Sequence, residues 1–181
     1  FNTPHARSVL ALFNELKYDL REIRDGKPVK PVFFTQLPRG INELDSIKNR
    51  KKIFIQIVLP LVLSENESIL AERKKILFLS KSRNISKTDQ LWLDKKFSYY
   101  KVKNKDFDSL LSKVDIIPPS LAIAQAAYES GWGTSRFALE GNSLFGQRTW
   151  ASKSGIVPLE RGQDQTFKVT KFDIIRASVK A

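Results

Sequence analysis

The stretch that most constrains the fold of this chain is residues 118–146, PPSLAIAQAAYESGWGTSRFALEGNSLFG. It opens with two prolines, which suit the first turn of a helix because the missing N–H would be unpaired there anyway. The alanines that follow favour a thin helix against which neighbouring elements can pack closely. Glycine just past a helix is its usual stop. The pattern therefore predicts a helix that ends on Glu129 and passes directly into a tight Gly-Trp-Gly turn at residues 131–133.

Glu129 is the one carboxylate of this predicted helix. Helical spacing places it on a face shared with Ala122 and Gln125, which is uncharged up to the acid. Both the negative end of the helix dipole and partial burial against Tyr128 and Trp132 would favour a protonated carboxyl group at this position. A carboxyl group that keeps its proton near neutral pH can serve as a general acid.

The same stretch resembles the bacterial N-acetylglucosaminidases that cut peptidoglycan, the FlgJ/Bax-like group of glycoside hydrolase family 73. These enzymes are also described as mannosyl-glycoprotein endo-β-N-acetylglucosaminidase-like. The resemblance rests on the segments Ala124–Ala127, Glu129–Gly133, Ser135, Ala138, Gly141–Asn142 and Leu144–Gly146. It is strongest over residues 116–181, while residues 1–115 resemble the helical region that precedes the catalytic part in the Bax-like branch.

The resemblance implies an α+β fold that is mainly α, with a lysozyme-like catalytic domain, a small antiparallel β lobe and a preceding helical region. We expect residues 1–115 to form that helical N-terminal region and to pack on the catalytic part. Residues 116–181 would form the glucosaminidase core. The runs 156–159 and 166–169 are short and β-like, and they lie between polar, glycine-containing segments, so they predict the lobe.

Apolar periodicity predicts the helices of the N-terminal region. Residues 5–24 carry apolar side chains at helical spacing and predict one amphipathic helix. Residues 43–80 predict a long helix that is kinked or broken just before Pro60, because proline cannot complete the helical hydrogen bonding. Two further helices are predicted over residues 86–102 and 106–114, the first capped by Ser86 or Thr88.

Site residues follow from the resemblance. Glu129 would be the general acid, and glycoside cleavage commonly requires a second carboxylate as base or nucleophile. Glu160 and Asp164 on the predicted lobe are the candidates, and Glu160 is preferred because it lies closer to the strand acid of the relatives. Alternatively, the acetamido group of the substrate acts as the nucleophile. The residues assigned to substrate binding are Ser130, Asn142, Phe145 and Gln147.

The activity that the resemblance implies is hydrolysis of the peptidoglycan glycan strand by an endo-β-N-acetylglucosaminidase. Two alternatives stay open: a lytic transglycosylase or muramidase on the same fold, and a non-catalytic module that only binds the cell wall. With one histidine and no cysteine, the sequence offers neither a metal-ligand spacing nor a Ser-His-Asp arrangement. We therefore expect no metal and no cofactor.

The formal net charge of +12 favours an anionic partner. A cell wall fits this charge, whereas the sequence contains no nucleic-acid-binding signature, so we expect peptidoglycan strands and no nucleic acid. No run reaches the roughly 20 apolar residues of a membrane span, so no transmembrane segment is expected. The oligomeric state is not specified by the sequence.

The implied substrate places the protein in the bacterial cell envelope, periplasmic or surface-exposed. The chain begins at Phe1 and contains no methionine, so we expect a targeting segment to have been removed upstream. A final helix begins near Asp173 and stops at Ala181. We therefore expect a C-terminally incomplete catalytic domain, and such a fragment can be inactive.

Overall fold

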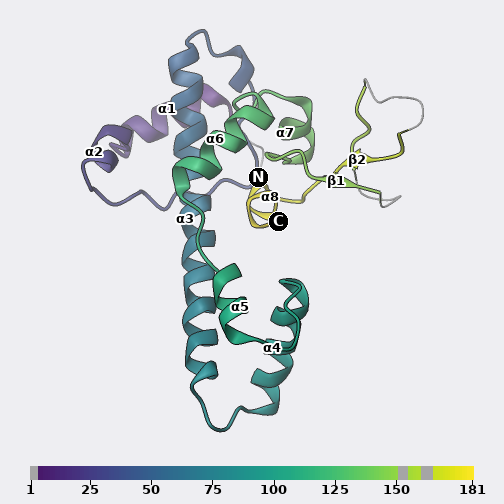
Figure 1. Ribbon diagram of the computed structural model, residues 1–181. Coiled ribbons are helices and arrows are strands. Elements are labelled where there is room, and N and C mark those ends of the chain that lie inside the picture. The colour runs from purple at the N-terminus through teal and green to yellow at the C-terminus, as the bar shows by residue number, and fades with distance from the viewer. Residues whose placement is uncertain (1–3, 151–154, 160–164) are drawn as a thin grey trace. The chain divides into compact units, whose positions relative to one another are not determined.

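A computed structural model describes residues 4–150, 155–159 and 165–181 (Figure 1). Its helices are α1 (Ala6–Glu15), α2 (Leu20–Arg24), α3 (Ile47–Ser80), α4 (Lys87–Tyr99), α5 (Phe107–Lys113), α6 (Pro119–Ser130), α7 (Arg136–Gly141) and α8 (Ile175–Lys180), with a 3₁₀ turn at Ile41–Glu43. Two short strands, β1 (Arg148–Thr149) and β2 (Lys168–Val169), complete the described elements. The predicted α+β, mainly α class is confirmed.

The chain divides into two compact units. The first combines Phe1–Leu63 with Pro119–Ala181, and the second is Ser64–Pro118. Helix α3 contributes its residues up to 63 to the first unit and the remainder to the second. The division predicted after residue 115 lies near one of these borders, and the assignment of the two sequence halves as domains stays a prediction.

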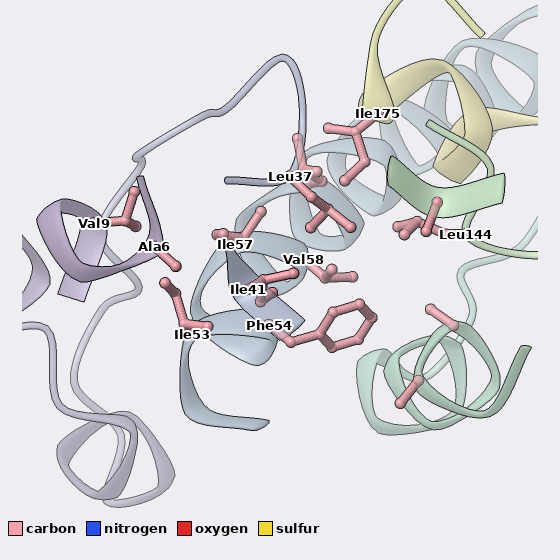
Figure 2. Close-up of a cluster of buried hydrophobic side chains, with 14 of the residues drawn as sticks. Ala6, Val9, Leu37, Ile41, Ile53, Phe54, Ile57, Val58, Leu144 and Ile175 are labelled. Carbon is pink, nitrogen blue, oxygen red and sulfur yellow. The ribbon is translucent and has the colours of Figure 1, made fainter. Parts of the chain in front are cut away.

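The core of the first unit is built around α3. Its apolar run places Ile53, Phe54 and Ile57 at 0% exposure. Figure 2 shows these side chains in the centre of the cluster, with Ala6 and Val9 of α1 on one side and Leu144 and Ile175 on the other. The segments before and after the second unit in the sequence therefore share one core, which explains why the unit is discontinuous in the chain.

Pro60 lies inside α3 without ending it, so the predicted break is wrong. Proline removes one backbone hydrogen bond and crowds the preceding turn. The adjoining turns are fixed by tertiary packing, because Ile57 and Leu61 on either side are 0% and 1% exposed. Burial of these turns offsets the local cost of the proline.

Helix α3 bears on the expectation that no segment spans a membrane, which stays a prediction. It is long and apolar enough to do so by length and composition, with a mean hydropathy of 1.5 over its most apolar window. Half of that window is buried inside the protein. Core helices pass the same test, and the packing of Ile53, Phe54 and Ile57 accounts for the apolar character of this one.

The predicted single helix over residues 5–24 is two helices, α1 and α2. The chain breaks at Lys17, which has a φ of 50°. Tyr18 is drawn into the core there, at 2% exposure, and meets Phe13 edge-on with ring centroids 5.3 Å apart. Gln56 donates its Nε2 hydrogen to the Tyr18 carbonyl at 2.5 Å. These tertiary contacts stabilise the break between α1 and α2, although the apolar periodicity predicts one continuous helix.

The second unit contains the C-terminal part of α3, α4 and α5. Its buried side chains are Ile76, Leu79, Leu93, Phe97, Leu110 and Val114. Ser86 caps α4 by accepting a hydrogen bond from the Asp89 amide at 3.1 Å, which confirms one of the two predicted caps. Arg73 on α3 donates to the carbonyls of Leu111 and Val114, so its guanidinium satisfies the end of α5.

The small β lobe is antiparallel, as predicted. β1 pairs with β2 in a register that sets Arg148 opposite Val169 and Thr149 opposite Lys168. Ile156 forms an isolated bridge to Val169, with backbone hydrogen bonds of 2.8 and 2.9 Å. Val169 is thus shared by two partners and is 6% exposed, which makes it the anchor of the lobe.

Candidate active site

The site is organised by the end of α6. The helix begins at Pro119, as the sequence predicted, and runs to Ser130. The Ser130 hydroxyl donates to the Ala126 carbonyl at 2.5 Å and accepts from the Gly133 amide at 2.9 Å. Since Ser130 is 0% exposed, both partners of its hydroxyl lie inside the protein. In this structure the Ser130 hydroxyl holds the turn together, and its assignment to substrate binding stays a prediction.

The turn after α6 has an unusual backbone. Gly131, Trp132 and Gly133 have φ values of 58°, 59° and 78°, in the left-handed region that favours glycine. Tertiary contacts hold the tryptophan in this conformation. Its ring meets Phe54 of α3 edge-on, with centroids 5.8 Å apart, and Lys51 Nζ lies 4.8 Å from its centroid. These contacts attach the turn to α3.

Gly133 is required by close packing as well as by its backbone angle. A Cβ atom on this residue would lie 2.8 Å from Leu37 Cδ1 and 3.0 Å from Phe54 Cδ2. Real Cβ atoms do not approach neighbours this closely. The contact therefore explains why the second glycine of the Gly-Trp-Gly turn carries no side chain.

Glu129 lies on the exposed face of α6. Burial against Tyr128 and Trp132, which the sequence suggested, is not observed: Tyr128 is 86% exposed and Trp132 packs toward α3. The reason is the helix phase, because Ala126, Ala127 and Ser130 occupy the buried face. The carboxylate of Glu129 is consequently accessible to a large molecule in solution.

A second loop approaches this carboxylate. A Cβ atom on Gly146 would lie 3.6 Å from Glu129 Oε2, and the glycine itself has a φ of 60°. The backbone of residue 146 therefore lies beside the acid, with Phe145 and Gln147 on either side in sequence. The end of α6, with Glu129, and the loop after α7, with Gly146, therefore lie side by side although α7 separates them in the sequence.

Asn142 sets the path of that loop. It ends α7 in a left-handed conformation with a φ of 52° and is 4% exposed. Its Nδ2 donates to the carbonyls of Phe172 and Asp173 at 3.0 and 3.2 Å. The side chain thus ties the loop to the segment that enters α8, and its function in this structure is to position the residues that follow.

Phe145 and Gln147 continue the loop. Phe145 is half-buried and packs against the core of the first unit. Gln147 donates its Nε2 hydrogen to the Ser178 carbonyl on α8 at 2.8 Å. Its Oε1 is buried and has no hydrogen-bond partner among the described residues. One acceptor of Gln147 is therefore left unpaired within the described part of the site.

The structure does not place the second carboxylate, because Glu160 and Asp164 lie outside the described residues. Among residues 4–150, 155–159 and 165–181, no group of three or more acidic, histidine or cysteine side chains could hold a metal ion. A pocket of about 460 Å³ lies around Tyr18, and Glu129 is not part of its lining. The assignment of Glu129 as the general acid stays a prediction.

Sequence reasoning missed three residues that shape this site: Lys51 and Phe54, which hold Trp132, and Ser178, which binds Gln147. Phe54 belongs to the apolar run of α3, but this run does not indicate which residue meets the turn. Lys51 and Ser178 carry no local signal. All three act through contacts between segments far apart in the chain.

Replacing Ser130 by alanine is expected to lower the free energy of unfolding of the first unit by about 1–3 kcal/mol, because the buried Gly133 amide loses its acceptor. Chemical denaturation followed by circular dichroism measures this loss. Ser8→Ala is the matched control, since Ser8 is an exposed serine on α1 of the same unit. Equal effects of the two substitutions would contradict the role assigned to Ser130.

Comparison with known proteins gives two matches. Residues 104–181 match the Glucosaminidase family, described as mannosyl-glycoprotein endo-beta-N-acetylglucosaminidase. Protein bax of Escherichia coli (strain K12) is 33% identical over 138 residues, which cover 73% of this chain and 48% of that protein. The matched part thus spans about half the length of this relative. No solved structure matches the chain significantly.

Proposed function

The chain belongs to the glucosaminidase family through residues 104–181, and on this basis we propose that it is the catalytic part of a bacterial peptidoglycan hydrolase. The specific activity we propose is that of an endo-β-N-acetylglucosaminidase. The observation that carries the proposal is the accessible carboxylate of Glu129 beside the backbone of Gly146. This carboxyl group lies at the surface, between the turn after α6 and the loop that contains Gly146. A polymer that is too large to enter a closed cavity can therefore reach it.

In the proposed reaction Glu129 gives its proton to the glycosidic oxygen as the bond between that oxygen and the anomeric carbon breaks. Water then adds to the anomeric carbon and loses a proton to a base. Proton exchange with the solvent afterwards restores the protonated Glu129 and the free base. Glu160 is the base or nucleophile that we prefer, with Asp164 as its rival. The acetamido group of the substrate is the third option for the nucleophile.

Gln147 is the residue we assign to the acetamido group. Its Nε2 hydrogen is engaged with Ser178, while its Oε1 has no partner among the described residues. Phe145, two residues earlier in the loop, is the residue we assign to stacking on a sugar face. Ser130 and Asn142 contribute indirectly, by holding the turn and the loop.

The proposed partner is the glycan strand of the cell wall, and the proposed location is the bacterial cell envelope. A formal charge of +12 supports both, because peptidoglycan and the envelope polymers around it are anionic. Fractionation of the natural protein tests the location. Recovery in the cytoplasmic fraction alone would contradict it.

Mass spectrometry of digested sacculi identifies the bond that is cut. We expect fragments with N-acetylglucosamine at the reducing end, because protonation and water addition at that linkage leave a free hemiacetal there. Anhydro-muramic ends would instead indicate a lytic transglycosylase, and reducing muramic ends a muramidase. Binding to sacculi without release of soluble fragments would indicate a non-catalytic wall-binding module and overturn the proposed activity.

A further inference from the structure

The C-terminal part of α3, which belongs to the second unit, carries apolar side chains on two opposite faces. Ile76 and Leu79 are buried in the core of that unit. On the other side of the helix, Leu70, Leu77 and Phe78 are 39%, 44% and 71% exposed. These three are not part of the core that the described residues form there. A surface helix of a soluble protein normally has a polar face opposite its apolar stripe, so this second apolar face is a feature to explain.

Two exposed lysines alternate with these apolar side chains. Lys74 lies four residues after Leu70 and four before Phe78. Lys81 follows Leu77 by four residues, directly after the end of α3. Residues four apart share one face of a helix, so the lysines and the apolar side chains form a single band. We call this band the outer stripe of α3.

The outer stripe lies in a strongly basic part of the chain. Residues 70–105 contain eleven Lys and Arg but three acids. Each of these acids is ion-paired with a lysine of the same unit. The pairs are Glu72 with Lys96 at 2.6 Å, Asp89 with Lys75 at 2.7 Å and Asp94 with Lys105 at 2.8 Å.

The two lysines of the stripe are not neutralised in this way. Lys74 and Lys81 form no ion pair with a described residue. Along α3, the nearest acid on the outer face is Glu67, one turn before Leu70. The outer stripe itself therefore presents positive charge together with exposed apolar surface, and its electrostatic complement is an anionic surface.

This combination of side chains favours a lipid surface over other anionic partners. A soluble polyanion would bind the lysines but leave Leu77 and Phe78 in water. Protein–protein interfaces are depleted in lysine, whereas here lysines separate the apolar side chains on successive turns. At a bilayer, leucine and phenylalanine enter the boundary between headgroups and acyl chains, while the lysines stay among the headgroups.

We propose that the outer stripe docks the protein on a lipid bilayer that contains anionic phospholipids. This part of α3 lies along the membrane surface, with Leu70, Leu77 and Phe78 inserted and the two lysines bound to lipid phosphates. The association is peripheral, because three inserted side chains are far fewer than the roughly 20 residues of a membrane span. It does not depend on the proposed glucosaminidase activity, since no residue of the Glu129 site takes part.

Cosedimentation of the 181-residue chain with vesicles tests this inference. We expect binding to vesicles of equal parts phosphatidylethanolamine and phosphatidylglycerol. Binding to vesicles of phosphatidylcholine alone should be about tenfold weaker or more, because the lysines lose their anionic partners. No binding to the phosphatidylglycerol vesicles, or equal binding to both kinds, would overturn the proposal.

Leu77→Ser with Phe78→Ser is expected to raise Kd for the phosphatidylglycerol vesicles about tenfold or more, because less apolar surface leaves water on binding. Leu91→Ser with Tyr99→Ser is the matched control, since these side chains are 65% and 69% exposed on α4 of the same unit. The control should bind like the original chain. Equal losses in the two double variants, at equal melting temperatures, would overturn the assignment to the outer stripe.

Lys74→Glu with Lys81→Glu tests the electrostatic part. Its control is Lys87→Glu with Lys95→Glu, which reverses the same number of charges on exposed lysines of α4. The outer-stripe variant should weaken vesicle binding about tenfold more than the control, because its lysines lie nearest the headgroups. Equal weakening would show attraction by net charge alone and overturn docking through α3.

Phe78→Trp reports insertion without removing apolar surface. On phosphatidylglycerol vesicles its fluorescence should shift to shorter wavelength beyond any shift of the original chain, whereas Tyr99→Trp should add none. No additional shift in Phe78→Trp would overturn insertion of the stripe. Binding of soluble poly(glycerol phosphate) as tightly as vesicles would overturn the lipid assignment in favour of a polyanion. Dimerisation without lipid that Leu77→Ser with Phe78→Ser abolishes would overturn it in favour of a second copy of the chain.

Discussion

Glu129→Gln is expected to reduce hydrolysis of peptidoglycan by the natural protein by about 100-fold or more, the range that general acid catalysis contributes. The amide keeps the shape of the side chain but cannot deliver a proton to the leaving oxygen. Because Glu129 is exposed at the end of α6, the substitution should leave folding and wall binding unchanged. Release of soluble fragments from sacculi gives the rate, and circular dichroism gives the melting temperature.

Glu140→Gln is the matched control for this experiment. Glu140 is also an exposed glutamate, on the neighbouring helix α7, and its substitution removes the same charge. We expect its turnover to stay near that of the original protein. Near-normal turnover in Glu129→Gln would contradict the assignment of the acid. An activity loss that merely follows a lower melting temperature would make Glu129 structural.

Gly133→Ala is expected to lower the free energy of unfolding of the first unit by about 2–5 kcal/mol. About 1–2 kcal/mol comes from a left-handed backbone in a residue with a Cβ atom, and about 1–3 kcal/mol from overpacking. The new methyl group would lie against Leu37 and Phe54, both buried side chains with little freedom to move. Urea denaturation measures the loss, and activity should fall with it because the turn fixes Glu129.

Gly26→Ala isolates the backbone part of this effect. Gly26 has a φ of 96°, but an added Cβ would meet nothing within 4 Å. It should therefore cost only the strain of about 1–2 kcal/mol and leave activity unchanged. Equal losses of stability in the two alanine variants would contradict this prediction. The contact of Gly133 with Leu37 and Phe54 would then contribute nothing to the free energy of unfolding, and the docking of the turn on α3 would need another explanation.

Much of the local structure could be predicted from sequence, and the reason differs between elements. The start of α6 at Pro119 and the glycine after Ser130 are local signals, as is the Ser86 cap of α4. One helix was predicted where the chain breaks at Lys17, and of the kink or break predicted at Pro60 the break is wrong. In both cases packing against the core outweighed local preference, because several buried side chains contribute more free energy than one turn.

The candidate site divides in the same way. Glu129 and the glycines around Trp132 were identified because a carboxylate, a helix stop and a turn are encoded by neighbouring residues. The exposure of the acid followed from the phase of α6, which is decided by the face that meets α3. The approach of Gly146 to the carboxylate could not be predicted, since two segments on either side of α7 must first be packed together.

Local sequence therefore specified the start of α6, the Ser86 cap and the turn after Glu129, because each depends on contacts within a few residues. Tertiary structure decided which residues hold that turn and the following loop in place. Lys51 and Phe54 reach Trp132 only because α3 packs against the end of α6, and Ser178 reaches Gln147 only because α8 folds back beneath the loop. Such contacts join segments with no fixed spacing in sequence, so only the assembled core determines them.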